Sequence, residues 1–445
     1  MMKTLNIISV MLVVPILCVA QKRLSLEECI ELARNNNKKI EASNFRIESA
    51  KYAKRATLSN YLPSLSITGN MLYSTVEGSL GIEGGMLPVV GMDGMPTGAG
   101  AYFPGINIDY GVDWMYGAGL QLQQPIFMGG KIVAGHKMGK LWEAMALQNH
   151  RLTDSEVIYE TAQAYANVVR ASGMCKVAAL YNDLLIELKY SVGKAFERGV
   201  KSRNDVLKIE VKLNESELGL RRAKNALRLA MMNLSHCIGY PLAAQIEVDD
   251  NIQLTGHEDV RVDISLRPEV QLLSQKSELI RQKANLERGD LLPQIGIVGQ
   301  YGYMNGFHFN GSKLFDDWNF TVGLQVSIPI FNFASHSKYR SAQMQYRQSQ
   351  AEESEKLELM TLEVTQAINN FDEAAFELRL AESGCISATE NLRVSGSQYK
   401  VGKESLTDYL EAQTLWRQAE QTLVEAKVNQ FLRWLDYKRK NGTLN

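Results

Sequence analysis

Two short polar motifs are the strongest candidates for chemistry in this sequence. Each pairs a serine with an aspartate three residues later, at Ser202 and Asp205 and again at Ser405 and Asp408. At this spacing the serine caps the first amides of a helix, and the acid is favoured by the positive helix end. Capping explains both aspartates without any further role. Glu411 is different, because it follows Asp408 by three residues, past the cap and on the same helical face.

No combination of residues typical of an enzyme active site is present. The six histidines lack the spacing of metal ligands, and the sequence has no phosphate-binding loop, no complete GxGxxG motif and no GxSxG motif. The cysteines have no paired spacing that would require a disulfide. We therefore predict that the protein is not an enzyme and has no cofactor and no catalytic metal.

The composition excludes several classes of protein. The 445 residues include 48 Lys and Arg against 49 Asp and Glu, which gives no electrostatic reason to bind nucleic acid. A hydrophobic fraction of 45% argues against disorder. No stretch after the first twenty residues is apolar and long enough to cross a bilayer as a helix.

The first twenty residues predict a signal peptide at 1–20. Lys3 provides a positive start, Leu5 to Leu17 are almost continuously apolar, and small residues precede Gln21. Cys18 as a lipidation site is the alternative, but the residue before it is a leucine rather than a small residue. Export from the cytoplasm follows from either interpretation.

Two long segments, 126–240 and 330–445, contain no proline and repeat apolar residues every three or four positions. This pattern predicts two long antiparallel helical hairpins, at 130–236 and 333–441. The hairpins are copies of each other, because Phe196-Glu-Arg-Gly199 before the first serine motif corresponds to Tyr399-Lys-Val-Gly402 before the second. The chain is therefore a tandem duplication.

Four segments alternate apolar and polar residues with a period of two, and we predict strands there. Each alternating run has about ten residues, enough for a tilted strand to cross ~25 Å of hydrocarbon. Trp114 and Trp318 lie near strand ends, where aromatic residues gather at a membrane interface. Two hairpins of a soluble sheet are the alternative. The predicted strands lie at about 62–75, 112–127, 291–304 and 317–331.

Four strands cannot close a membrane barrel, for which about eight is the minimum, and open edges are not tolerated in lipid. We therefore expect several chains to share one barrel. Thr75 to Gly111, between the first two strands, is glycine-rich, and we interpret it as a mobile surface loop over the barrel mouth. Its methionines suit Cu(I), but they have no regular repeat, so copper binding is the weaker alternative.

Taken together, these features resemble the TolC-like outer-membrane efflux proteins, also called outer membrane factors. The resemblance rests on the export signal, the duplicated order of strands and helical hairpins, Gln124-Pro125-Ile-Phe-Met-Gly-Gly130, and Tyr399–Gly402 leading to Ser405–Leu410. It covers essentially the whole mature chain. It implies a mainly α fold with a membrane β portion: a homotrimer whose twelve-stranded β-barrel, with four strands per chain, continues into a periplasmic α-helical barrel.

The resemblance also implies the domain organisation. A first structural repeat, 21–262, contains an N-terminal helix, two strands, the first hairpin and an equatorial segment at 237–262. A second repeat, 263–445, contains a helix at 264–288, two strands and the second hairpin.

The function implied by the resemblance is that of a passive exit duct. Such a channel lies in the outer membrane of a Gram-negative-type cell, in contact with outer-membrane lipid, and extends into the periplasm. It serves a tripartite efflux or type I secretion system, in which an inner-membrane transporter and a periplasmic adaptor (membrane fusion) protein deliver the substrate. The exported substance, whether drug, metal or protein, is not encoded in these motifs. A non-conducting structural coiled-coil protein of the cell envelope is the alternative.

The resemblance assigns roles to residues at the hairpin tips. Acids matching Asp408 and Glu411 form rings that narrow the periplasmic entrance, although the second family acid is usually Asp. Glu404 stands where the best-known member has an arginine that helps to latch the tip, and this departure argues against that latch. The tip glycines serve equally well to let the chain turn. The candidates for adaptor contact are Phe196, Gly199, Val200, Asp205, Tyr399, Val401 and Gly402.

Overall fold

The computed structural model describes residues 23–244, 246–249, 261–314 and 316–444. The predicted signal peptide and Cys18 lie outside the described residues, as do 250–260 of the predicted equatorial segment. The chain forms two compact units, one of Met1–Ile47, Ala146–Ser274 and Glu353–Asn445 and the other of Glu48–Met145 and Gln275–Glu352. None of the helices in the described ranges has the length and apolar character needed to cross a membrane.

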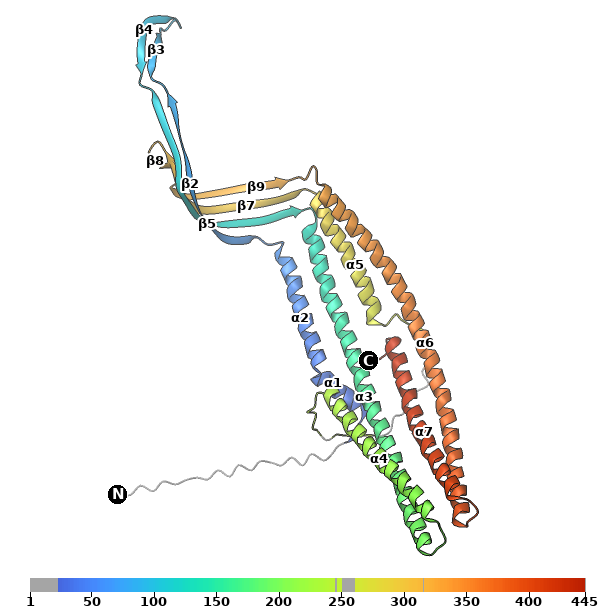
Figure 1. Ribbon diagram of the computed structural model, residues 1–445. Coiled ribbons are helices and arrows are strands. Elements are labelled where there is room, and N and C mark those ends of the chain that lie inside the picture. The colour runs from blue at the N-terminus through green and yellow to red at the C-terminus, as the bar shows by residue number, and fades with distance from the viewer. Residues whose placement is uncertain (1–22, 245, 250–260, 315, 445) are drawn as a thin grey trace, which may run out of the picture. The chain divides into compact units, whose positions relative to one another are not determined.

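Helices make up most of the described chain, and the two longest have 67 and 68 residues without interruption. They lie in the segments that lack proline, the residue that breaks helices most strongly. The helices are α1 (Leu26–Asn36), α2 (Lys38–Ser59), α3 (Lys131–Glu197), α4 (Arg203–Cys237), α5 (Pro268–Arg288), α6 (Phe333–Lys400) and α7 (Leu406–Lys440), with a short 3-10 turn at Gly289–Leu291 (Figure 1).

The N-terminal helix is divided in two at Asn37, whose backbone is extended. The Asn37 side chain accepts a hydrogen bond from the amide of Lys39 at 2.8 Å and donates one to the carbonyl of Cys237 at 3.0 Å. Asparagine side chains compete in this way with helical hydrogen bonds. The break therefore ties the start of α2 to the end of α4.

The core of the first unit is built on the predicted apolar spacing. In α3 the side chains of Val157, Ala164 and Val168 are at most 1% exposed. They form a cluster with apolar residues of α1 and α4. Two short strands, β1 (Arg23–Leu24) and β6 (Glu247–Val248), pair in parallel beside this cluster. The segment after α4 is thereby joined to the start of the described chain.

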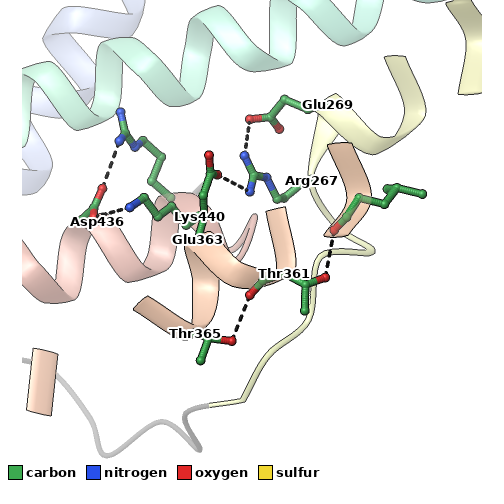
Figure 2. Close-up of polar contacts among 9 residues, drawn as sticks. Arg267, Glu269, Thr361, Glu363, Thr365, Asp436 and Lys440 are labelled. Atoms are coloured by element: carbon green, nitrogen blue, oxygen red, sulfur yellow. Dashed lines mark hydrogen bonds and ion pairs between the residues drawn. The ribbon is translucent and has the colours of Figure 1, made fainter. Parts of the chain in front are cut away.

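A second group of contacts in this unit is centred on Arg267, the residue just before α5. Its side chain is only 8% exposed and forms ion pairs with Glu363 of α6 at 3.2 Å and with Glu269 of α5 at 3.1 Å (Figure 2). Nearby, the hydroxyl of Tyr437 in α7 accepts from the backbone amide of Arg261 at 3.2 Å. These contacts hold residues 261–267 against α6 and α7.

The second unit contains an antiparallel sheet whose main strands follow the order β2-β5-β7-β9. Its strands are β2 (Ser64–Ile82), β5 (Ile106–Met128), β7 (Gln294–Phe309) and β9 (Asp317–Ser327), with a short β8 (Ser312–Leu314) that also pairs with β7. Within the described part of the chain, β2 and β9 each pair on one side only.

The interpretation of Thr75–Gly111 as a loop is wrong. After a bulge between Tyr73 and Val76, β2 continues to pair with β5 as far as Ile82 and Ile106. Between them lies a separate two-stranded sheet, β3 (Gly85–Val90) and β4 (Pro96–Phe103). The apolar and polar alternation weakens among the many glycines, but glycine does not prevent a strand from pairing, so the strands run on beyond the predicted ends.

Candidate functional site

One face of the sheet is apolar and exposed. On β9, the alternate residues Phe320, Val322 and Leu324 are 73%, 63% and 65% exposed, and on β2, Ile67 and Met71 are 81% and 69% exposed. In a water-soluble sheet, the apolar face of a period-two strand packs on a core. These rows instead need a hydrocarbon environment.

Aromatic side chains form pairs between neighbouring strands of the sheet. Trp318 lies near the start of β9, as the sequence predicts, but the prediction that Trp114 lies near a strand end is wrong, because β5 begins at Ile106. Trp318 stacks on Tyr301 of the neighbouring strand with ring centres 5.2 Å apart, and Trp114 lies 5.0 Å from Tyr73. Tryptophan and tyrosine favour the boundary between lipid and water, because they have an apolar ring and a polar edge. The exposed rows and the aromatic pairs are together typical of membrane-spanning strands.

The hairpin tips are shaped by two matching turns. Gly199 and Gly402 have φ angles of +75° and +76°, a backbone region that strains residues with a side chain. The amide of Val200 donates to the carbonyl of Ala195 at 2.9 Å, a bond of the kind that ends helices at such a glycine. The role of these glycines in turning the chain is therefore clear from the backbone itself.

The serine motifs cap α4 and α7. The hydroxyl of Ser202 accepts from the amide of Asp205 at 3.1 Å, and the carboxylate of Asp205 accepts from the amide of Ser202 at 3.1 Å. Hydrogen bonds from the side chain and the backbone of Ser202 lower the pKa of Asp205. At the second tip, Ser405 accepts from the amide of Asp408 at 3.2 Å. The capping interpretation is confirmed at both tips.

The two tips of one chain are in contact. The ammonium of Lys201, in the first tip, lies 4.7 Å from the centre of the Tyr399 ring in the second tip. Tyr399 stacks on Tyr409 of α7, with centres 5.1 Å apart. Lys208 donates to the hydroxyl of Thr407 at 3.4 Å. The tip of the α3–α4 hairpin is thus connected to the tip of the α6–α7 hairpin through its turn, at Lys201, and through the start of α4, at Lys208.

The Tyr399 hydroxyl is buried and has no hydrogen-bond partner within the described chain. Burial raises the pKa of Tyr399, and the negative charge of Asp205 raises it further. The phenol thus stays neutral at the join between the tips, and its ring is the part that makes contacts.

An apolar cluster continues from the tips along the helices. It includes Ile209 of α4 and Leu185 of α3, both fully buried, together with Leu410 and Trp416 of α7. Gln413 lies between these two α7 residues and is 0% exposed, yet neither end of its amide has a hydrogen-bond partner in the described residues. A polar group buried without a partner costs about 1–3 kcal/mol.

The predicted site residues divide into two groups. Asp408 and Glu411 are exposed, one turn apart on α7, with no basic partner among the described residues. Val200 and Val401, at the two tips, are 72% and 68% exposed. Tyr399 is half-buried, in contact with the other tip. The first four side chains are therefore exposed to solvent, and Tyr399 contributes to the contact between the tips.

Sequence reasoning missed Lys201, Lys208, Tyr409 and Gln413 as site residues. The two lysines flank the Asp205 motif, and Tyr409 directly follows Asp408. Their closeness in sequence to the two aspartates indicates that these residues lie at the tips. The contact between the tips, however, depends on tertiary packing and has no sequence signal. Among the described residues, no group of three or more His, Cys, Asp and Glu side chains is placed to hold a metal ion.

The chain belongs to the outer membrane efflux protein family, which matches residues 29–240 and 264–434. It is 25% identical to the outer membrane protein TolC of Escherichia coli K12 over 358 residues, which cover 74% of this chain and 69% of TolC. It is 22% identical to the alkaline protease secretion protein AprF of Pseudomonas aeruginosa, covering 74% of this chain and 70% of AprF.

Solved structures show the same fold. The CmeC outer membrane channel of Campylobacter jejuni superposes with a TM-score of 0.76 at 18% identity, over 94% of this chain and 85% of that one. The outer membrane protein VceC of Vibrio cholerae gives 0.75 at 16% identity, over 94% and 96%.

The resemblance stated from the sequence is therefore confirmed. The protein is an outer-membrane channel and not an enzyme, and it extends from the outer membrane into the periplasm. Its fold is mainly α with a membrane β portion, the fold of channels in which a β-barrel continues into an α-helical barrel.

Proposed function

We propose that three copies of this chain form a passive exit duct for substances delivered from the inner membrane. The observation that carries the proposal is the sheet with an exposed apolar face, whose outer strands β2 and β9 each have one edge without a partner among the described residues. An edge in lipid must be paired, so β9 of one copy pairs with β2 of the next. Four strands from each of three copies make twelve, and the number three follows from the resemblance to TolC-like proteins.

The duct receives its substrate from a periplasmic adaptor protein and an inner-membrane transporter, in an efflux or type I secretion system. The AprF relative is described as a secretion protein and the family as efflux proteins, which supports both kinds of system. The chain itself contributes no energy source. The two structural repeats, 21–262 and 263–445, each provide one strand hairpin and one helical hairpin to the duct.

The entrance is formed by the hairpin tips. Asp408 and Glu411 are exposed and unpaired by basic side chains in the described residues, which suits a ring of six carboxylates around a threefold axis. Such a ring attracts cations and resists closure by like-charge repulsion. The cap uses the backbone amide of Asp408, which donates to the hydroxyl of Ser405. Asp408 can therefore take part in both the cap and the ring.

The adaptor binds the exposed parts of the two turns. Val200 and Val401 present isolated apolar side chains beside Gly199 and Gly402, and Phe196 is 38% exposed on the last turn of α3. Aromatic side chains are the more usual anchors of protein contacts, so Phe196 and Tyr399 would contribute most and the two valines would add contact area. Asp205 and Tyr399, whose side chains are half-buried, lie at the margin of this surface.

The proposal is tested on the full-length protein extracted in detergent. Native mass spectrometry should give a trimer, and the same particles should conduct ions in planar bilayers. Monomeric particles would contradict the shared barrel. Trimers that never conduct, in any orientation or voltage, would instead favour the structural coiled-coil alternative.

A further inference from the structure

The two-stranded sheet β3–β4 continues the hairpin formed by β2 and β5 (Figure 1). We call residues Gly84–Gly105 the outer hairpin. The other ends of β2 and β5 lead into α2 and α3, the helices of the periplasmic portion. The outer hairpin therefore lies at the outside end of these strands.

The outer hairpin is apolar on both faces and has almost no charge. Met86 and Tyr102 are paired across the strands and are 68% and 71% exposed, and Leu87, on the opposite face, is 55% exposed. At its turn Met92 is fully exposed, and Asp93 is the only charged residue of the hairpin. A two-stranded hairpin by itself is marginally stable, and an exposed apolar patch of this kind needs a partner.

An added strand is a poor partner for the outer hairpin. Pro88 lies within β3 and Pro96 begins β4, and proline has no amide hydrogen to offer to a neighbouring strand. Prolines on edge strands are a recognised device against edge-to-edge pairing. The partner must therefore contact the faces of the hairpin through side chains.

The lipid surface is also a poor partner. No lysine or arginine occurs between Arg55 and Lys131, whereas Glu77, Glu83 and Asp93 lie in or beside the hairpin. Segments that lie on a membrane surface use basic residues to bind anionic head groups. The charges of this region would instead be repelled by a layer of phosphates.

A second copy of the same hairpin fits these restrictions. The outer hairpin follows directly from β2, the strand whose free edge a neighbouring copy covers in the proposed trimer. The neighbours in one barrel thus carry identical apolar hairpins at the same end. We propose that the outer hairpins of the three copies pack against one another through their faces and form an apolar contact across the outer mouth. This inference rests on the proposed trimeric barrel.

Cross-linking tests the contact apart from the trimer. In a chain whose Cys29, Cys175, Cys237 and Cys385 are replaced by alanine, Met92→Cys should give covalently joined pairs of chains with a short bismaleimide. The matched control is Ser312→Cys in the short polar β8, which should give none. Native mass before the reaction reports the trimer independently.

Three outcomes of this experiment would overturn the contact. The first is an intact trimer without joined pairs, and the second is equal cross-linking at Ser312→Cys. The third is joined pairs found only in particles of twice the trimer mass, because these would show end-to-end contact between channels. Loss of the trimer itself in both variants would contradict the proposed function instead.

Conductance provides a second, independent measurement. Met92→Lys with Met95→Lys places six positive charges in the apolar contact of a trimer, so the mouth should open and single-channel conductance should rise severalfold. Met92→Ala with Met95→Ala keeps the contact region uncharged and should leave conductance close to that of the parent. Equal conductance of the lysine variant and the parent, in particles of unchanged mass, would overturn a contact across the mouth.

Discussion

The ammonium of Lys201 lies 4.7 Å from the centre of the Tyr399 ring, so the turn of the α3–α4 hairpin contacts the last turn of α6. Tyr399 is in turn stacked on Tyr409. The two tips of a single chain are therefore joined by a chain of aromatic and cationic side chains. In the proposed duct, movement of one tip away from the other would break this contact when the entrance widens.

Removal of the charge at Lys201 should loosen the tips. A cation over an aromatic ring contributes about 0.5–1 kcal/mol at exposed sites. Lys201→Met keeps most of the side-chain length, and we expect a higher open probability of the channel in planar bilayers. The matched control is Lys194→Met, because Lys194 lies 4.2 Å from the ring of Tyr190 within a single helix and joins no tips. An equal response to both substitutions would contradict the role of Lys201.

Neutralisation of the two exposed acids of α7 should weaken cation binding at the entrance. Asp408→Asn with Glu411→Gln keeps side-chain size and leaves Ser405 in place as the cap. We expect weaker block of the current by divalent cations and weaker cation selectivity, because opposite charge attracts ions to a narrow passage. The control is Glu358→Gln, an exposed acid in the middle of α6. Unchanged divalent block in the double variant would remove both acids from the entrance.

The sequence predicts local structure well and contacts between elements poorly. Proline-free segments with regular apolar spacing predict α3 and α6, because a helix depends on residues three and four positions apart. The capping motifs at Ser202 and Ser405 are equally local. By contrast, the grip of Lys201 on Tyr399 joins residues far apart in sequence, and β2 beyond Tyr73 lies in a glycine-rich stretch where alternation is weak. Pairing with β5 decides the structure there.

Loss of the Ser202 cap should destabilise the first tip. Replacement of an N-cap serine by alanine costs about 0.5–2 kcal/mol. For Ser202→Ala we expect faster amide hydrogen exchange in the first turns of α4, with little change in α7. Ser387→Ala, inside α6 and away from its ends, is the control, because its hydroxyl donates to the carbonyl of Ser383 one turn earlier, at 3.0 Å, and caps no helix. Protection of α4 equal to that of the parent would contradict the cap.

The same cap predicts a pH dependence. The pKa of Asp205 is lowered in the folded protein by hydrogen bonds from Ser202, so the folded state binds this proton less readily than the unfolded chain. The contribution to stability is thus present above the ordinary aspartate pKa, about 3.9, and is lost as pH falls through the lower folded value. Amide exchange at the start of α4 should accelerate in that acid range, relative to the middle of the helix. In Ser202→Ala this acid-dependent difference should be much smaller, and a full difference in that variant would contradict the assignment.

Near the tips, the buried amide of Gln413 lowers the free energy of unfolding. Its amide is fully buried between Leu410 and Trp416 without a partner in the described residues, at a cost of about 1–3 kcal/mol. Gln413→Leu should remove this cost, raise the Tm of the detergent-extracted channel and reduce its open probability, because the helices then separate less readily. Gln418→Leu, at an exposed position on the same helix, should change stability by no more than about 0.5 kcal/mol. A lower Tm for Gln413→Leu, with Gln418→Leu unchanged, would mean that the amide has partners in the assembled channel and that its burial favours the closed tips.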